Sequence, residues 1–224
     1  MEKEKVLGQR STFLRKNNSR ELIIKINPSD YKNIFLINGK IFLTTNISES
    51  DLIIKPNSYY MIINNKNKAL NIQFSEDISA HKIIYNPYKY ESSEKVNFKE
   101  EQFIKKYKIP EGYISTLPKW YSFKFSYPSF NFIFVRPEFG LSIQIHRDRK
   151  EFWEILAGKP IIISGNKVYY YVKNETLFQI PINTYHSVIN PNKQKDKFVV
   201  IKERWEGKFD EFDIERVFNP NNYK

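Results

Sequence analysis

The sequence predicts an all-β fold, a sandwich or a barrel, for the 224-residue chain. Three observations lead to this prediction. Aromatic residues make up 16% of the chain and, together with Ile and Val, far outnumber Ala, which is typical of strands. Short apolar or alternating runs are separated by clusters of Pro, Asn, Gly and Ser. Two-residue β-hairpins are indicated by Asn-Gly at 38–39 and Gly-Asn at 165–166.

The composition also excludes several classes of protein. The chain has no cysteine, which rules out disulfides, thiolate nucleophiles and cysteine-ligated metals. No segment approaches about 18 consecutive apolar residues, and the charged start MEKEKVLGQRS lacks the apolar region of a secretion signal. We therefore expect a cytoplasmic protein without a membrane partner.

The formal net charge of +11 raises the question of nucleic-acid binding. The lysines are scattered, however, and no run of five like charges occurs. We therefore expect no nucleic-acid partner. A small phosphorylated substrate would suit a basic protein equally well.

The strand pattern divides the chain into two halves. Four to six strands fit before residue 75, and a second, richer series begins near Tyr121. Between them the pattern is lost and Lys and Glu increase, with a short helix expected around Lys99 to Tyr107. We expect an N-terminal half at 1–95, a connection at 96–118 and a C-terminal domain at 119–224. A short helical turn is expected in the tail.

A faint repeat relates the two halves. NGKIFLTTN and the strands after it resemble AGKPIIISGN and the strands after that. The correspondence places an apolar or tyrosine residue, near Tyr60 to Ile62, where the second half has His186. The first half is therefore expected to keep the scaffold without a metal site.

Candidate metal ligands lie between Gly140 and Gly158. If Leu141 to Ile145 is a strand, Gln144 and His146 project from the same face, because side chains two apart share a face. The charged run Arg147 to Lys150 is then expected to form a turn. Glu151 begins a second strand, which could return alongside the first and bring a carboxylate to the same place.

His186 is the expected fourth ligand. It follows a turn rich in Pro and Asn and starts another apolar run, so we expect it to meet His146 across a barrel. Two imidazoles, a carboxylate and an amide oxygen suit one divalent cation, with Zn favoured and Mn, Fe, Co or Ni acceptable. His81 has no such partner and is interpreted as structural. Basic residues at or near strand ends are candidates for phosphate binding or proton transfer: Arg136, Lys202, Arg204 and Arg216.

Two groups of residues in the second half share the spacing of a known pair of motifs. The first group is Gln144, His146, Glu151 and Gly158, with Glu138 where the motif has its opening Gly. The second group is Pro181, His186 and Asn190, with Asn183 in place of a Gly. From about Trp120 to Arg216 the chain therefore resembles the cupin superfamily.

Gln144 indicates which cupin family the chain resembles most. The string from Leu141 to His146 is similar to the Leu-Ser-Leu-Gln-x-His run in the cupin domain of type II phosphomannose isomerases, which also occurs fused to mannose-1-phosphate guanylyltransferase. The chain departs from that family at Asp148 and Phe152, where the family has further histidines. Its Arg-Pro-Trp-Gly opening is reduced here to Pro118, Lys119 and Trp120. None of these departures removes a candidate ligand.

The resemblance implies a bicupin, with two double-stranded β-helix barrels of which the first is degenerate. It also implies a metal-dependent isomerase that interconverts mannose 6-phosphate and fructose 6-phosphate, with a homodimer formed through edge strands. Two alternatives are another metal-cupin enzyme, such as a sugar epimerase or an Fe dioxygenase, and a non-catalytic carbohydrate-binding cupin.

Overall fold

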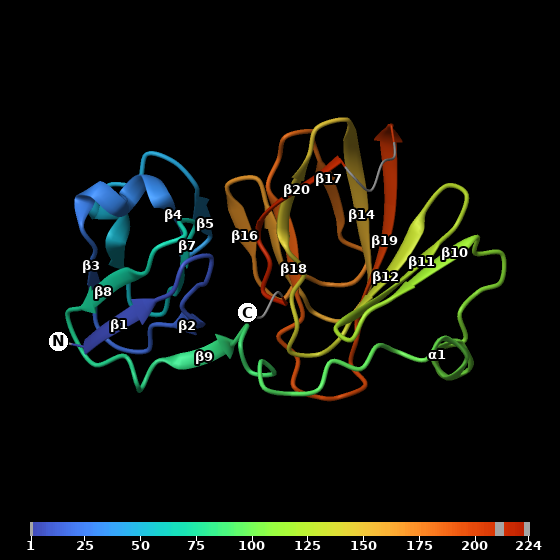
Figure 1. The fold of residues 1–224 in the computed structure, drawn as a ribbon, viewed down its shortest axis with the longest axis horizontal. Helices are drawn as coiled ribbons and strands as arrows, with labels where there is room; N and C mark the ends of the chain where they lie inside the picture. The colour runs from blue at the N-terminus through green and yellow to red at the C-terminus, as the bar shows by residue number, and fades with distance from the viewer. Residues whose placement is uncertain (1, 209–212, 222–224) are drawn as a thin grey trace. The chain divides into compact units, whose positions relative to one another are not determined.

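The structure, a computed structural model, describes residues 2–208 and 213–221. It divides into two compact units. Unit 1 comprises Met1–Pro87 and Gly165–Tyr169, and unit 2 comprises Tyr88–Ser164 and Tyr170–Lys224 (Figure 1). None of the helices in the described part of the chain has the length and apolar character needed to cross a membrane.

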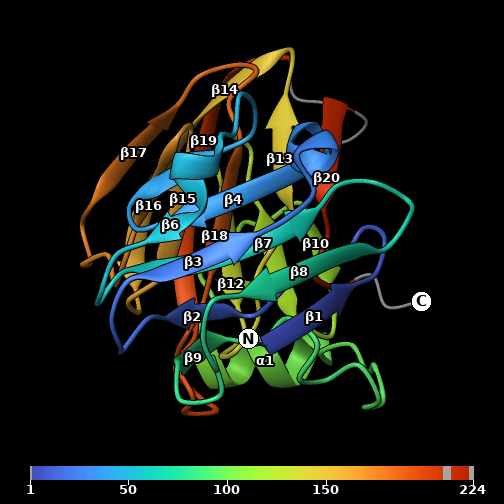
Figure 2. The same cartoon turned by 90° about the vertical axis from the view of Figure 1, so that its left-hand side faces the viewer.

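Unit 1 is built almost entirely from strands. They are β1 (Glu2–Val6), β2 (Leu14–Lys16), β3 (Leu22–Lys25), β4 (Ile34–Asn38), β5 (Ile41–Leu43), β6 (Ile53–Ile54), β7 (Tyr59–Asn64), β8 (Leu70–Phe74), β9 (Lys82–Tyr85) and β16 (Lys167–Tyr169). Two short 3-10 helices are η1 (Pro28–Asn33) and η2 (Glu49–Leu52). One sheet has the order β1-β8-β3-β6, and the other has the order β16-β5-β4-β7-β2-β9 (Figure 2).

The core of unit 1 lies between these two sheets. Leu22 and Ile24 alternate with exposed residues on β3, and they join Leu36 and Ile62 of the other sheet in one cluster of buried side chains. The described residues contain eight strands before residue 75, more than the four to six expected, because the polar N-terminal segment contributes β1 and β2. The predicted hairpin between β4 and β5 is confirmed, but its turn residues are Gly39, whose φ is 59°, and Lys40, because Asn38 still pairs with Ile41.

Among its described residues, unit 2 has one α-helix and two sheets. The helix is α1 (Glu100–Tyr107), which confirms the predicted helix. The strands are β10 (Ser115–Pro118), β11 (Ser122–Ser126), β12 (Asn131–Val135), β13 (Ile143–His146), β14 (Arg149–Ala157), β15 (Ile161–Ser164), β17 (Leu177–Ile180), β18 (His186–Ile189), β19 (Val199–Gly207) and β20 (Ile214–Phe218). Their orders are β10-β11-β12-β19-β14-β17 and β20-β13-β18-β15.

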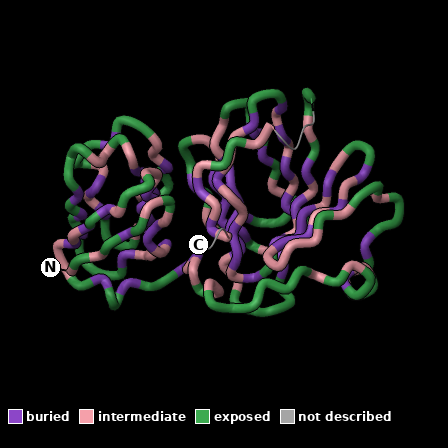
Figure 3. The backbone as a smooth tube through the Cα atoms, in the orientation of Figure 1, coloured by how far each residue is buried: buried purple, intermediate pink, exposed green. Residues whose placement is uncertain are grey.

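The two sheets of unit 2 face each other and curl into a half-barrel (Figure 1). Val135, Ile155 and Ile201 of the larger sheet pack in one buried cluster with Ile162 and Val188 of the smaller sheet. Buried positions recur along the strands of both sheets (Figure 3). The predicted all-β fold is confirmed.

A second, aromatic core lies on the outer face of the larger sheet. Phe103 of α1 packs there against Phe123 and Phe125 of β11, with ring centroids 4.8 and 6.0 Å away. Because strand side chains alternate between faces, Lys124 of β11 must point to the opposite, inner face. The helix therefore fixes the strand that carries Lys124.

One expectation about local structure is wrong. The turn after β13 spans only Arg147 and Asp148, because Arg149 and Lys150 already pair with β19. The tail forms β20, which pairs with β13. The helical turn expected in the tail agrees with the 3-10 conformation of Asp213, and residues 209–212 lie outside the described part.

We expect Phe103→Ala to lower the free energy of unfolding by about 3–5 kcal/mol, because it removes a ring that is only 4% exposed and leaves a cavity. Urea denaturation followed by far-UV circular dichroism measures this change. Lys105→Ala, on the exposed face of the same helix, is the matched control and should change stability by less than about 0.5 kcal/mol. Equal effects of the two substitutions would contradict the packing described for α1.

Candidate metal centre

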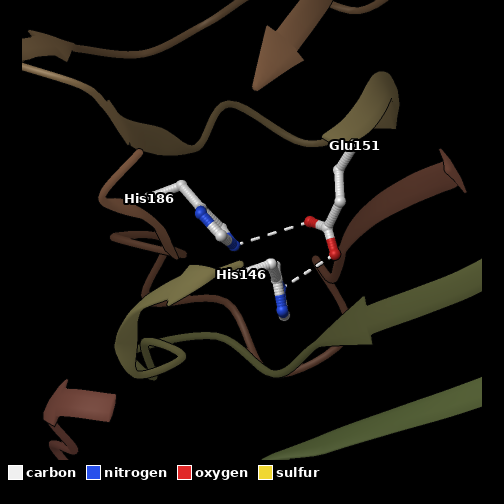
Figure 4. A group of neighbouring side chains, drawn as sticks. All are labelled: His146, Glu151 and His186. Atoms are coloured by element: carbon white, nitrogen blue, oxygen red, sulfur yellow. Dashed lines mark ion pairs between the residues drawn. The ribbon is translucent and has the colours of Figure 1, made fainter. Parts of the chain in front are cut away.

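Three candidate ligands gather inside unit 2. His146, Glu151 and His186 each offer one ligand atom, and these atoms lie within 4.8 Å of one another (Figure 4). All three side chains are almost fully buried. Residues that are far apart in sequence therefore form one compact group of nitrogen and oxygen donors.

The way in which the strands bring these donors together differs from the expected one. β13 and β18 are antiparallel neighbours, with Gln144 opposite His186, so the two histidines lie side by side in one sheet and do not meet across a barrel. Their ring centroids are 5.0 Å apart. β14 pairs with β17 and β19 of the facing sheet and does not return alongside β13, so the carboxylate of Glu151 is the group that comes from across the half-barrel.

Gln144 completes the predicted set. Its Nε2 lies 3.5 Å from Nε2 of His146 and 3.4 Å from Nε2 of His186. Its Oε1 accepts a hydrogen bond of 2.9 Å from the hydroxyl of Ser142. A half-turn of the amide exchanges these two atoms and directs the oxygen at the histidines, while Ser142 can then accept a hydrogen bond from the NH₂ group.

The environment of His186 favours a neutral ring with a bare Nε2. Its Nδ1 lies 2.9 Å from the carbonyl oxygen of Thr184, which can only accept, so the ring proton is on Nδ1. Burial lowers the pKa of His186, although the charge of Glu151 opposes this effect. The lone pair of Nε2 is then directed at Oε2 of Glu151, 3.5 Å away.

Glu151 is held as a carboxylate. Burial raises its pKa, but the hydrogen bond from His146 and the electrostatic interactions with His186, His146 and Arg149 outweigh burial and lower the pKa to about 2. Nε of Arg149 and Nε1 of Trp153 donate hydrogen bonds to Oε1 and Oε2, each over 3.1 Å. These two donors fix the orientation of the carboxylate.

The donor set fits a divalent cation. The nitrogen lone pair of His186 faces a carboxylate oxygen without a proton between them, and a shared cation would satisfy both. Nδ1 of His146 is buried without a hydrogen bond and lies 3.8 Å from Oδ2 of Asp213. At metal sites a carboxylate in this position commonly orients the histidine ligand. One contact competes: Nη2 of Arg149 lies 3.2 Å from Nε2 of His146, so a cation at that nitrogen must displace the guanidinium.

A cavity of about 100 Å³ opens beside these residues and is rich in positive charge. Gln144 and Glu151 line it together with Glu203. The basic residues that line it are Lys119, Lys124, Arg149 and Arg216. An anionic ligand would relieve the repulsion among these like charges.

The basic residues predicted from sequence are not all at this cavity. Arg216 lies opposite Gln144 in the β13–β20 pair and lines the cavity. Lys202 and Arg204 alternate on β19 with the buried Ile201 and Glu203, so they project from the other face of the strand. Accordingly, Nζ of Lys202 lies 4.7 Å from the ring centre of Phe130, on the outer face.

Two further predicted residues lie away from the cavity. The guanidinium of Arg136 lies over the rings of Phe98 and Phe139 and donates a hydrogen bond to the backbone oxygen of Trp120. His81 is buried in unit 1, where its Nδ1 is 2.7 Å from the hydroxyl of Tyr60. Its position agrees with a structural role.

Sequence reasoning missed two residues that line the cavity, Lys124 and Glu203. Each is a charged residue at an inward position of an alternating strand, between Ser122 and Ser126 in β11 and after Ile201 in β19. A charged residue at a strand position where the alternation predicts an inward, apolar side chain is the signal that could have identified them.

Comparison with known proteins supports the resemblance found in the sequence. The family described as mannose-6-phosphate isomerase C-terminal matches residues 97–219, more than half of the chain. The matched region contains all four candidate ligands.

Curated relatives match over shorter stretches. The chain is 38% identical over 68 residues to a mannose-1-phosphate guanylyltransferase of Klebsiella pneumoniae and 36% identical over 61 residues to mannose-1-phosphate guanylyltransferase ManC of Salmonella typhimurium. These stretches cover 30% and 27% of this chain, and only 14% and 12% of the relatives' lengths. A solved structure described as a sugar phosphate isomerase from a cupin superfamily, from Silicibacter pomeroyi, is 12% identical with a TM-score of 0.33, over 39% of this chain and 60% of that one.

The extent of the family match decides the classification of this protein. The chain belongs to the mannose-6-phosphate isomerase C-terminal family, within the cupin superfamily.

Proposed function

We propose that this protein is a metal-dependent sugar-phosphate isomerase that interconverts mannose 6-phosphate and fructose 6-phosphate. The observation that carries the proposal is the convergence of His146, Glu151 and His186 beside a cavity lined with cations. Membership of the family supports the same class of substrate. The whole reaction needs an electrophile for a carbonyl group, a cationic site for a phosphate and a group that moves a proton.

Gln144, His146, Glu151 and His186 would hold one divalent cation, with Zn favoured and Mn, Fe, Co or Ni also suited to these ligands. The cation would supply a Lewis acid that polarises the sugar carbonyl. The chain itself prepares the ligands: Trp153 orients the carboxylate, and the carbonyl of Thr184 keeps the proton of His186 on Nδ1.

The phosphate would bind at the basic part of the cavity. Lys119, Lys124 and Arg216 line this cavity and supply donors that suit phosphate oxygens, whereas a buried ion pair commits Arg149 to Glu151. Lys124 and Leu117 also line a second cavity of about 520 Å³. This second cavity would give room for the part of a sugar phosphate that does not fit in the cavity of about 100 Å³. An unphosphorylated sugar would bind more weakly, because it would not relieve the repulsion among the positively charged side chains of the cavity.

A second candidate function is carbohydrate binding without catalysis. The contact of Arg149 with Nε2 of His146 favours it, because a guanidinium at that nitrogen takes the place of a metal ion. In that case the cavity would bind an anionic sugar through its basic residues alone. Metal binding separates the two candidates.

Unit 1 is proposed to be a degenerate cupin that acts as a scaffold. Two sheets enclose its core, and its buried histidine is engaged by a tyrosine hydroxyl. We also propose a homodimer, by analogy with edge-strand pairing of β proteins. Light scattering of the purified chain tests the second proposal.

Metal binding provides the first test. We expect the wild-type protein, purified without chelator, to hold one divalent cation per chain, and His146→Ala or Glu151→Gln to weaken binding by at least roughly 100-fold. Titration calorimetry with Zn²⁺ and elemental analysis measure these quantities. Glu154→Gln, three residues along β14 and on its other face, is the matched control and should bind as wild type does. Unchanged affinity in both ligand variants would rule out this metal site.

Turnover provides the second test. The metal-loaded protein should convert mannose 6-phosphate into fructose 6-phosphate, and Arg216→Gln should raise KM roughly 10- to 100-fold, because it removes a charge-assisted hydrogen bond. A coupled assay for fructose 6-phosphate measures both. Arg204→Gln, on the outward face of β19, controls for loss of a positive charge. Absence of turnover with Zn, Mn, Fe, Co and Ni, together with retained sugar-phosphate binding, would favour the non-catalytic candidate.

A further inference from the structure

Glu203 is a carboxyl group in the cavity that the metal set does not use. It lies on the inner face of β19, opposite Trp153 of β14, and its side chain is buried among the residues that line the cavity. Among the described residues that line this cavity, Glu151 and Glu203 are the two with a carboxyl group. The position of Glu203 beside the candidate ligands therefore requires an explanation.

The two carboxyl groups have different partners. Both oxygens of Glu151 accept hydrogen bonds, Oε1 from Arg149 and His146 and Oε2 from Trp153. Glu203 accepts a hydrogen bond of 2.7 Å at Oε1 from a neutral group, Nδ2 of the Asn131 amide. Asn131 lies opposite Glu203 in the β12–β19 pair, so the strand register sets this contact. Glu203 is thus anchored through one oxygen while it lines the cavity.

Such a carboxyl is poorly suited to a purely structural role. A buried glutamate costs free energy when it is charged, and an apolar residue would pack at this position of β19 without that cost. Burial raises the pKa of Glu203 to about 8 and the charge of Glu151 adds to this effect, whereas the hydrogen bond from Asn131 and the charges of Lys124 and Arg149 oppose it. A carboxyl that titrates near neutral pH can both accept and return a proton.

We infer that Glu203 is the proton-transfer residue of this site, an inference that rests on the proposed isomerase function. In the aldose-to-ketose direction the Glu203 carboxylate takes the proton from C2. The electron pair of the broken C2–H bond becomes the C1–C2 double bond, and the carbonyl π pair moves to O1, which takes the proton of the neighbouring O2 hydroxyl to give an enediolate with its charge on O2.

The second half of the reaction returns this proton. Glu203 gives it to C1, the double-bond pair forms the new C1–H bond, and an electron pair of the charged O2 forms the C2 carbonyl. One hydrogen moves from C2 to C1 and another from O2 to O1, so the sum requires no oxidant or reductant.

The test measures proton exchange and net conversion separately. The metal-loaded full chain is incubated in D₂O with mannose 6-phosphate or fructose 6-phosphate, and NMR follows the loss of the C2 or C1 proton, while a coupled assay follows conversion. Glu203→Gln keeps the shape of the side chain and an oxygen that accepts from Asn131, but it cannot carry the proton. We expect it to slow exchange and conversion by about 10²- to 10⁴-fold, with metal content and KM close to wild type.

The matched control is Glu206→Gln, an exposed carboxylate on the same strand, which should retain wild-type rates. Glu203→Asp should recover part of the lost exchange rate, because it restores a carboxyl. Conversion by Glu203→Gln at more than a tenth of the wild-type rate would overturn the inference and leave the isomerase function standing. Exchange that depends on Glu203 without net conversion would overturn the proposed substrate pair and uphold the inference. Neither exchange nor conversion by the loaded wild type would overturn both.

Discussion

The placement of one buried carboxylate beside two imidazoles is the constraint on which unit 2 depends. A charge at the position of Glu151 is costly unless it is fully compensated, and its compensation comes from both sheets. Arg149 and Trp153 contribute from its own strand, and His146 contributes from the facing sheet. The two sheets must therefore keep a fixed separation at this point, and the hydrophobic cluster beneath them maintains it.

Strand alternation lets the same sheet build two unrelated surfaces. On β11 the outward Phe123 and Phe125 pack under α1, while Lys124 between them lines the cavity. On β19 the inward Glu203 lines the cavity, while Lys202 faces outward over an aromatic ring. A one-residue shift in either strand would turn the cavity-lining side chains toward the aromatic core and the aromatic side chains toward the cavity. Packing on both faces of the sheet therefore stabilises the strand register that forms the site.

The spacing of Gln144, His146, Glu151 and His186 was sufficient to predict that these residues gather, because period-two alternation and turn residues act locally. The sheet to which each strand belongs could not be predicted, since nothing in the strand from Arg149 onward specifies whether it pairs with its predecessor or crosses to the facing sheet. We therefore expected the two histidines to meet across a barrel. In the structure they lie on neighbouring strands of one sheet, and the carboxylate of Glu151 comes from the facing sheet. Lys202 was chosen by its charge and its expected place near a strand end, whereas the face of β19 from which it projects is decided by packing.

Trp153 connects the chemistry of the site to an optical signal. Its indole nitrogen donates to Glu151, its ring meets His186 edge-on with centroids 5.3 Å apart, and the rest of the side chain belongs to the hydrophobic core. Any neutralisation of that carboxylate changes the electric field along the indole and therefore its fluorescence. The protein thus contains its own spectroscopic reporter, whose emission follows the charge state of the centre without an added label.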